Sequence, residues 1–444
     1  MILGKIKGRL TSFQIIILGF AGVILLGALL LMLPISTNAH ISTPFDDAIF
    51  TSTSAVCVTG LVVKDTATYW SLFGQVVILV LIQIGGLGVI TVASFLTMLA
   101  GKKIGLMQRQ TMQNAVAAPQ MGGIVRFTRF IFVSTFIVEL IGVLLLLPFF
   151  CGEYGREGIW MSVFHSISAF CNAGFDLMGN KSGEFSSLTL YSDNPYLTAV
   201  ICILIIVGGI GFLTWNDIVT HKLRVKEYRM QTKVILVSTL ILLIIPAVIF
   251  FFIDFANEPL TERVCKSVFQ AVTPRTAGFN TADLSAMTES GRAVIMLLML
   301  VGGAPGSTAG GVKTTTIAIL LVNAVSIFRK KRNVNCFGRR IDDSIIKNAA
   351  TVFFLYLSLA IVSAIAICIA EKLPMQQCMF ETVSAIATVG LSLGITPQLG
   401  GFAHLVLTLL MFLGRVGGLT IIFAAFSNKE IEVSKYPLEN IMVG

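Results

Sequence analysis

The sequence predicts an all-α membrane protein that crosses the bilayer several times. Of its 444 residues, 55% are hydrophobic and 12% are charged, and the mean hydropathy is +0.87. A soluble protein of this length would carry about a quarter charged residues. Residues 13–33 and 72–100 contain no charged side chain, and about 20 such residues are enough to cross a bilayer.

Eight segments are long and apolar enough to span the membrane as helices. They cover residues 13–33, 72–100, 130–150, 196–213, 234–253, 293–328 with an interruption, 349–370 and 402–426. The first follows Lys5, Lys7 and Arg9, as a signal peptide would, but its apolar core is too long and no cleavage site follows it. We therefore expect it to be a retained helix.

The distribution of positive charge predicts how the helices are oriented. If the amino terminus is cytoplasmic, 22 of the 32 Lys and Arg residues fall in cytoplasmic segments, and the outer segments hold 8 of them with 15 Asp and Glu. This bias places both termini in the cytoplasm of a multi-pass cell-membrane protein. The run 329–332 (RKKR) then fixes the topology and contacts lipid headgroups, or docks a cytoplasmic partner. The net charge of +9 requires no nucleic acid as a partner.

Four short stretches recur in the segments expected outside. They read FTSTSAVCVTGL, FHSISAFCNAGF, FQAVTPRTAGF and FETVSAIATVGL, and they contain Gly60, Gly174, Gly278 and Gly390. Each has Phe, then Ser or Thr four residues later, then Gly, with the third stretch one residue shorter. Each is too short to span a bilayer, so we expect a re-entrant half-helix that ends in a glycine turn.

A second glycine mark follows each turn. It lies at 85–86, 208–209, 302–303 and 414–415, at offsets of 25, 34, 24 and 24 residues. The extra residues of the second copy fall in the polar loop 181–194, where insertion is well tolerated. The chain thus divides into four repeats, 1–100, 101–221, 222–340 and 341–444. We predict eight transmembrane helices and four re-entrant helices as pseudo-symmetric helix–loop–helix repeats around one pore.

The glycine loops have the chemistry to bind a dehydrated cation. A cation near the bilayer centre costs several kcal/mol or more, and rings of backbone carbonyls can replace its hydration shell. Glycine tolerates the backbone this requires, and the carboxyl end of each half-helix carries a partial negative charge. The predicted filter residues are Val58, Thr59, Gly60, Asn172, Ala173, Gly174, Thr276, Ala277, Gly278, Thr388, Val389 and Gly390.

The third returning helix should be broken below this filter. Residues 302–311 read GGAPGSTAGG, which no continuous helix accommodates, whereas the other three repeats are expected to have an intact helix here. The segment is either a mobile flap that narrows the pore or a rigid packing kink. The predicted gate residues are Gly302, Gly303, Gly306, Gly310, Gly311, Lys313 and Arg415.

Arg415 occupies the place at which the other repeats have glycine. A charged side chain in a membrane helix is costly and usually functional. It either forms an electrostatic barrier beneath the filter or donates hydrogen bonds to carbonyls of the broken helix, and the two roles are compatible.

Other buried polar residues give weaker signals. Glu139 is expected to contact another helix or a second subunit, and Arg275 to anchor the third loop from behind. Glu381 and His165 both precede their glycine by nine residues, and His165 is expected to be a packed side chain. The eight cysteines show neither a C-x-x-C pair nor metal-ligand spacing, so we expect small buried residues.

These loops, the GGAPGSTAGG segment and the following GRVGG resemble the Trk/Ktr/HKT superfamily of potassium transporters over nearly the whole chain. Eight spans without an additional amino-terminal pair resemble most closely the Ktr-type membrane subunit. The resemblance implies that K⁺ binds at the filter. In this superfamily a Ser in the first loop goes with sodium, and Gly60 therefore favours potassium. Residues 302–316 match the gating loop, and Arg415 matches the pore arginine.

The same resemblance implies a homodimer with one pore per subunit, on a cytoplasmic ring of nucleotide-binding regulatory subunits. This chain has no G-x-G-x-x-G after a strand, so any nucleotide would bind the partner.

Na⁺ dependence, symport and channel-like passage all stay open. A secondary transporter of another small cation or solute is the alternative, but it predicts inverted repeats. An intramembrane enzyme would need a nucleophile or metal set that the spans lack.

Overall fold

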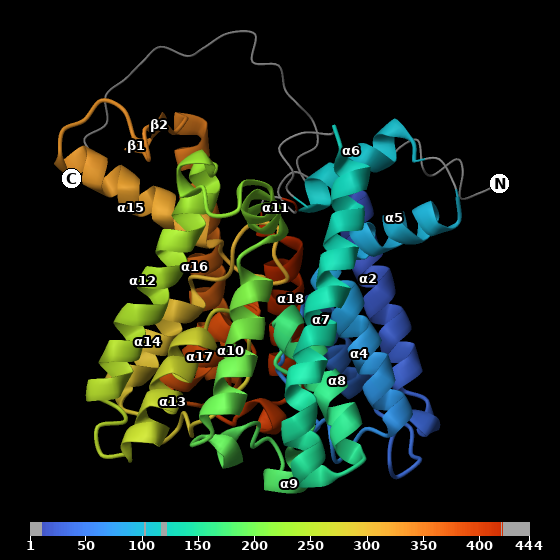
Figure 1. Cartoon of the computed structure of the whole chain (residues 1–444). Helices are drawn as coiled ribbons and strands as arrows, with labels where there is room; N and C mark the ends of the chain where they lie inside the picture. Colours follow the sequence, from blue (N-terminus) through green and yellow to red (C-terminus); the bar gives the residue numbers. More distant parts are fainter. Residues whose placement is uncertain (1–10, 102–103, 117–121, 419, 421–444) are drawn as a thin grey trace.

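The computed structural model describes residues 11–101, 104–116, 122–418 and 420. Within these ranges the elements of regular secondary structure are helices, apart from one small antiparallel hairpin of β1 (Asn335–Cys336) and β2 (Arg339–Arg340). The long helices run side by side through the body of the molecule (Figure 1). The predicted all-α class is therefore confirmed.

Among the described residues, four single helices are long and apolar enough to cross a membrane. They are α2 (Ser12–Leu31), α7 (Ile124–Tyr154), α12 (Met230–Phe252) and α16 (Asp343–Glu371). Each coincides with a predicted span. Their outward faces carry exposed apolar side chains, such as Phe136 and Leu140 on α7 and Leu240 on α12. Such a surface is stable in lipid rather than in water.

A shorter helix packs on each of these four. The short helices are 12 to 15 residues long: α3 (Phe45–Cys57), α8 (Glu157–Cys171), α13 (Leu260–Val272) and α17 (Met375–Ile386). Pro44, Pro259 and Pro374 directly precede three of them. Proline lacks a backbone N–H and does not continue a helix, which fixes these amino-terminal ends.

Four further helices close the assembly into a circle. They are α4 (Leu72–Leu87), α10 (Pro195–Gly209), α14 (Glu289–Met299) and α18 (Gly401–Val416). Helix α4 packs on α8, α10 on α13, α14 on α17, and α18 returns to α3. Ser71, Asn194 and Thr288 cap the starts of three of them by accepting a backbone hydrogen bond. Each of these helices therefore contacts the short helix of the following set.

The returning helices bend where the sequence suggested intact spans. Helix α4 meets α5 (Val89–Leu99) at 95°, and α10 meets α11 (Phe212–His221) at 95°. The predictions of an unbroken helix over 72–100 and of a break confined to the third repeat are therefore wrong. The predicted span 402–426 ends as α18 at Val416, and most of its remainder lies outside the described residues.

Glycine explains three of the four breaks. Gly88, Gly211 and Gly417 follow the returning helices with φ of 86°, 88° and 91°, a region that glycine enters without steric cost. The third set has Pro305 at the corresponding place, and proline is locked near φ −65°. There the chain opens into a long loop before α15 (Thr314–Phe328) instead of bending once.

The remaining elements lie at the two ends of the bundle. Figure 1 shows α5, α6 (Leu106–Val116), α11, β1 and β2 at one end and α9 (Gly179–Ser182) at the other. The described elements of the segments 101–129, 217–233 and 329–347, which are predicted to be cytoplasmic, thus lie at one end, although their side of the membrane stays a prediction. The part of the chain that the structure describes also contains four 3₁₀ turns: Pro34–Ser36, Thr189–Tyr191, Val225–Glu227 and Thr396–Gln398.

Candidate functional site

The four short helices end in the same unusual backbone turn. Two residues before each glycine, the chain has a positive φ at a residue that is not glycine: Val58 (55°), Asn172 (57°), Thr276 (70°) and Thr388 (51°). Such a conformation costs of order 1–3 kcal/mol per residue and persists only where the surroundings impose it. The glycines themselves have φ of 92° at Gly60, 71° at Gly174, 81° at Gly278 and 86° at Gly390.

The four glycines form a closed ring. A β-carbon added to Gly60 would lie 2.5 Å from the Ala173 carbonyl oxygen, one on Gly174 2.7 Å from that of Ala277, and one on Gly278 2.6 Å from that of Val389. A β-carbon on Gly390 would overlap with the Thr59 carbonyl oxygen and close the circle. Each glycine thus lies against the carbonyl that precedes the next one. The four turns, distant in sequence, bring four backbone carbonyls around one centre.

The recurrent Ser or Thr bonds to its own loop in three of the four stretches. The Ser54 hydroxyl accepts from the Gly60 N–H at 3.1 Å, Ser168 donates to the Phe175 carbonyl at 2.7 Å, and Thr273 donates to the Phe279 carbonyl at 2.5 Å. The hydroxyl of Ser384 in the fourth stretch is buried without a partner. The recurrent Phe side chains, Phe50, Phe164, Phe269 and Phe380, are all fully buried behind these loops.

His165 and Glu381 bond to the segments after their glycines. His165 Nε2 accepts from the Leu177 N–H at 3.4 Å, and Glu381 accepts from the Leu393 N–H at 3.1 Å. Both N–H groups lie three residues beyond the ring glycine. Glu381 also accepts from the Ser392 and Thr396 hydroxyls, each at 2.7 Å. These two residues therefore support the loops from behind, and His165 is packed as expected.

At three of the four second glycine marks, the returning helix lies in close contact with the carboxyl end of a short helix. A β-carbon on Gly85, Gly208 or Gly414 would overlap with the carbonyl oxygen of Val56, Phe170 or Ile386, respectively. Each of these carbonyls lies four residues before a ring glycine. Only glycine permits so close an approach of two backbones. This contact explains why the second glycine mark recurs in the first, second and fourth copies.

The loop 302–313 passes from the second helix set to the fourth. The Ala304 N–H donates to the Gly209 carbonyl at 2.9 Å, and the Phe212 N–H donates to the Gly306 carbonyl at 2.8 Å. At its other end a β-carbon on Gly310 would overlap with the Thr388 hydroxyl, and one on Gly311 would lie 2.7 Å from the Ala387 carbonyl. The loop therefore lies directly against the turn that precedes the Gly390 part of the ring.

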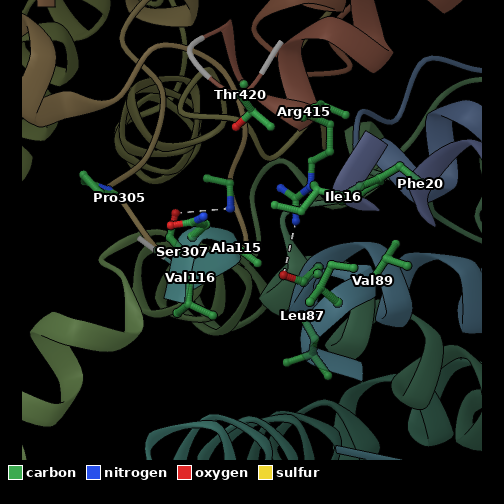
Figure 2. A pocket seen from close by; sticks show the side chains of 18 of the residues that line it. Ile16, Phe20, Leu87, Val89, Ala115, Val116, Pro305, Ser307, Arg415 and Thr420 are labelled. Atoms are coloured by element: carbon green, nitrogen blue, oxygen red, sulfur yellow. Dashed lines mark hydrogen bonds between the residues drawn. The ribbon is translucent and has the colours of Figure 1, made fainter. Parts of the chain in front are cut away.

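A cavity of about 510 Å³ is lined by this loop, the returning helices and the end of α6. Figure 2 shows Pro305, Ser307 and Val116 on one side of it and Leu87 and Val89 on the other, with Arg415 reaching in from α18. Arg415 donates to the Gly85 and Gly86 carbonyls at 2.5 and 3.2 Å and to the Thr308 carbonyl. It therefore links α18 to α4 and to the loop.

Lys313 is the second cation on this cavity. Its ammonium donates to the Ala309 and Gly310 carbonyls at 2.8 and 3.3 Å. All predicted gate residues thus lie in or beside this one loop, and Arg415 reaches it from another helix. Both cationic side chains donate hydrogen bonds to backbone carbonyls of the loop. For Arg415 this agrees with the second of its two predicted roles.

A second cavity, of about 140 Å³, is lined by all four ring glycines together with Asp65 and Asp176. Burial raises the pKa of the Asp176 carboxyl to about 7, and the Asp65 charge adds to the rise. The Asp65 carboxylate accepts from the Thr68 and Phe185 N–H groups at 2.9 and 3.0 Å. The ring therefore borders an acidic cavity.

The sequence interpretation missed the role of the segment 181–194. Phe185 and Ser187 line the acidic cavity with positive φ of 61° and 49°. The Leu188 N–H donates to the Asn280 carbonyl at 2.9 Å, and the Asn280 N–H donates to the Ser187 hydroxyl at 3.1 Å. The extra residues of the second repeat thus form part of the cavity wall. Their only signal was the unusual length of this repeat.

Arg275 and Glu139 both bond to a neighbouring helix. Arg275 donates to the Thr239 hydroxyl of α12 at 3.2 Å, and its Nε is buried without a partner. Glu139 accepts from the Gln83 amide of α4 at 3.2 Å, which agrees with the expected contact to another helix. All eight cysteines are free thiols.

A comparison with known families decides the assignment. The sequence model of the TrkH family, described as cation transport protein, matches residues 9–433. The chain belongs to the TrkH family of cation transport proteins. The family assigned by resemblance is therefore confirmed, and it is a family of transporters rather than of enzymes.

Two relatives and one solved structure show which members of the TrkH family this chain resembles. The chain is 39% identical to the potassium/sodium uptake protein NtpJ of Enterococcus hirae, covering 99% of both chains. It is 39% identical to the Ktr system potassium uptake protein B of Bacillus subtilis, covering 98% of this chain and 97% of that one. The potassium transporter TrkH of Vibrio parahaemolyticus has the same fold, with a TM-score of 0.72 over 93% of this chain and 84% of the other at 17% identity.

Proposed function

We propose that this TrkH-family protein takes K⁺ across the cell membrane through the ring of four glycine loops. The closed ring is the observation that carries the proposal, because it gathers the carbonyls of Thr59, Ala173, Ala277 and Val389 around one centre. Several carbonyl oxygens at once can replace the hydration shell of a cation. The names of the two relatives, a potassium/sodium and a potassium uptake protein, support K⁺ as the ion.

The proposed architecture is four repeats, 1–100, 101–221, 222–340 and 341–444, with eight spans and four re-entrant helices around one pore. The circular packing of α4 on α8, α10 on α13, α14 on α17 and α18 on α3 supports it. Both termini are cytoplasmic in this proposal. The acidic cavity then faces outward and the cavity with Arg415 and Lys313 faces the cytoplasm.

The loop 302–313 is the proposed gate of the pore. It lies against the turn before Gly390, lines the inner cavity, and is bound by Arg415 through the Thr308 carbonyl. Arg415 adds a positive charge that opposes cation passage while it holds the loop. If this hydrogen bond broke, the loop would be free to move, and the positive charge of Arg415 could leave the path of the ion at the same time.

We propose further that the protein works as a homodimer on a cytoplasmic ring of nucleotide-binding subunits. The similarity to a Ktr system protein supports this, and any ATP or ADP would bind the partner. Na⁺ is a second candidate ion because one relative is named a potassium/sodium uptake protein.

Uptake into proteoliposomes tests this function. Purified protein should take up K⁺ and Rb⁺ well above Na⁺ and Li⁺, with and without a cytoplasmic partner present. Uptake of an organic solute in place of these ions would favour a secondary transporter of another substrate and contradict the proposal.

Replacing Gly60 with serine should lower the preference for K⁺ over Na⁺. The added side chain would meet the Ala173 carbonyl, which a β-carbon already approaches to 2.5 Å, and distort one quarter of the ring. We expect the K⁺/Na⁺ uptake ratio to fall about tenfold, which corresponds to roughly 1.4 kcal/mol of lost discrimination. Paired uptake assays measure the ratio. An unchanged ratio would show that the first loop does not select the ion.

Replacing Asp176 with asparagine should remove a pH response of uptake. With its pKa near 7, the carboxyl is ionised at pH 8 and protonated at pH 6, so acid removes a negative charge beside the ring. The half-saturating K⁺ concentration of the wild type should therefore rise on the order of threefold from pH 8 to pH 6.

The Asp176→Asn variant should show the higher value at both pH values. Asp46→Asn, at an exposed position on α3, is the matched control and should keep the wild-type response. A variant at Asp176 that retained the full response would assign it to another group.

A further inference from the structure

Glu139 is an acidic side chain buried in α7, with 4% of its surface exposed. Its backbone carbonyl accepts a hydrogen bond from the Ser166 hydroxyl at 2.7 Å. In the first helix set, the Ile24 carbonyl accepts the same bond from Ser52, also at 2.7 Å. In the first set, the residue of the long helix that accepts this bond is therefore apolar, and the short helix α3 still packs on α2 in the same way. The fold does not require an acid here.

Side chains from three helices meet at the Glu139 carboxylate. The Gln83 amide of α4 donates to Oε2 at 3.2 Å. The Cys171 sulfur, at the end of α8, lies 3.9 Å from Oε1 and 3.7 Å from the Gln83 amide oxygen. Among the ion pairs of the described residues, none includes Glu139. The carboxylate therefore lacks the cationic partner that usually offsets burial.

This cluster lies directly behind the second loop of the ring. Cys171 immediately precedes Asn172, the first residue of the strained turn. A β-carbon on Gly86 would lie 2.7 Å from the Cys171 sulfur, and the Gly86 carbonyl accepts from Arg415. One side chain, that of Cys171, thus separates the carboxylate from the loop backbone.

We propose that Glu139 is a positioning residue that raises the affinity of the ring for its cation from behind the second loop. This inference rests on the proposed conduction function. A cation in the ring lowers the cost of ionising a carboxylate that has no other positive partner. By the reciprocity of linked equilibria, the carboxylate must strengthen cation binding by the same factor. At an effective dielectric constant near 20 and a separation on the order of 10 Å, the factor is roughly tenfold when the carboxyl is ionised before the cation binds, and it is smaller when burial keeps the carboxyl protonated.

The variant Glu139→Gln tests the proposal, because the amide keeps the size of the side chain and cannot ionise. We expect the half-saturating K⁺ concentration for uptake into proteoliposomes in alkaline buffer, in which the wild-type carboxyl is ionised, to rise roughly tenfold, with the maximal rate per folded protein unchanged. Glu153→Gln, an exposed position on the same helix, is the matched control and should match the wild type in both. A purely structural role would lower the amount of folded protein or the maximal rate without moving the half-saturating concentration.

An unchanged half-saturating concentration in Glu139→Gln would overturn the proposal. Failure of the wild type to take up K⁺ would instead refute the proposed function, so the two failures are distinguishable.

The variant Gln83→Met keeps the test decisive if Glu139→Gln does not fold. It removes the amide that donates to the carboxylate and should raise the half-saturating concentration about two- to threefold. No change would overturn the proposal. The double variant should resemble Glu139→Gln alone, because Gln83 acts through the carboxylate, whereas additive effects would contradict that coupling.

Discussion

Replacing Gly390 with alanine should abolish K⁺ uptake by the otherwise folded protein. Gly390 has a φ of 86°, and a β-carbon at this position would overlap with the Thr59 carbonyl oxygen of the first loop. The Thr59 carbonyl is part of the backbone of the first loop, so the overlap can be relieved only if the first and fourth loops move apart. We therefore expect uptake to fall to the background of empty vesicles, as measured with Rb⁺ as a tracer.

Gly394→Ala is a matched control for this variant. Gly394 lies four residues further along, has a φ of 84°, and has no atom within 4 Å of an added β-carbon. It therefore carries the cost of the left-handed backbone alone, about 1–2 kcal/mol, and should retain uptake. If Gly390→Ala transported as well as Gly394→Ala, the close contact between loops would not matter for function.

Replacing Arg415 with methionine should increase the rate of uptake. The guanidinium holds the loop 302–313 through the Thr308 carbonyl and adds a positive charge to the cavity of about 510 Å³. Removing one unit charge at a distance on the order of 10 Å, with an effective dielectric constant near 20, lowers the barrier enough for roughly a tenfold gain in rate. The initial rate of Rb⁺ uptake per folded protein measures the effect.

Arg415→Lys separates the two contributions of this side chain. Lysine keeps the charge but cannot reproduce the forked hydrogen bonds to Gly85, Gly86 and Thr308. A fast lysine variant would assign control to the hydrogen bonds, and a slow one to the charge. A methionine variant that folds and transports at or below the wild-type rate would contradict both.

The sequence was most informative where four copies could be compared. Gly60 alone is an ordinary helix-terminating glycine, but Gly174, Gly278 and Gly390 repeat its setting, so their convergence could be expected. The preceding Ser or Thr recurs for a physical reason that became clear only from the hydrogen bonds of Ser54, Ser168 and Thr273 to their loops.

Features without a strong local signal could not be predicted. Gly88 and Gly211 each lie in a long apolar run that reads as one helix, and a single glycine there costs only about 1 kcal/mol against alanine. The local sequence is therefore compatible with both a continuous helix and a bend, and only the structure shows the positive φ of 86° and 88° at these two glycines. The partners of Glu139 are likewise distant in sequence, since Gln83 and Cys171 come from two different repeats.

The central claim is that the carbonyls of Thr59, Ala173, Ala277 and Val389 hold the transported cation. A structure determined in Rb⁺, with anomalous diffraction to locate the ion, tests this most directly. The account predicts Rb⁺ on the axis of the ring, coordinated by these four carbonyls, and its loss in Gly390→Ala. Rb⁺ bound elsewhere in a protein that transports it, with the ring empty, would contradict the account.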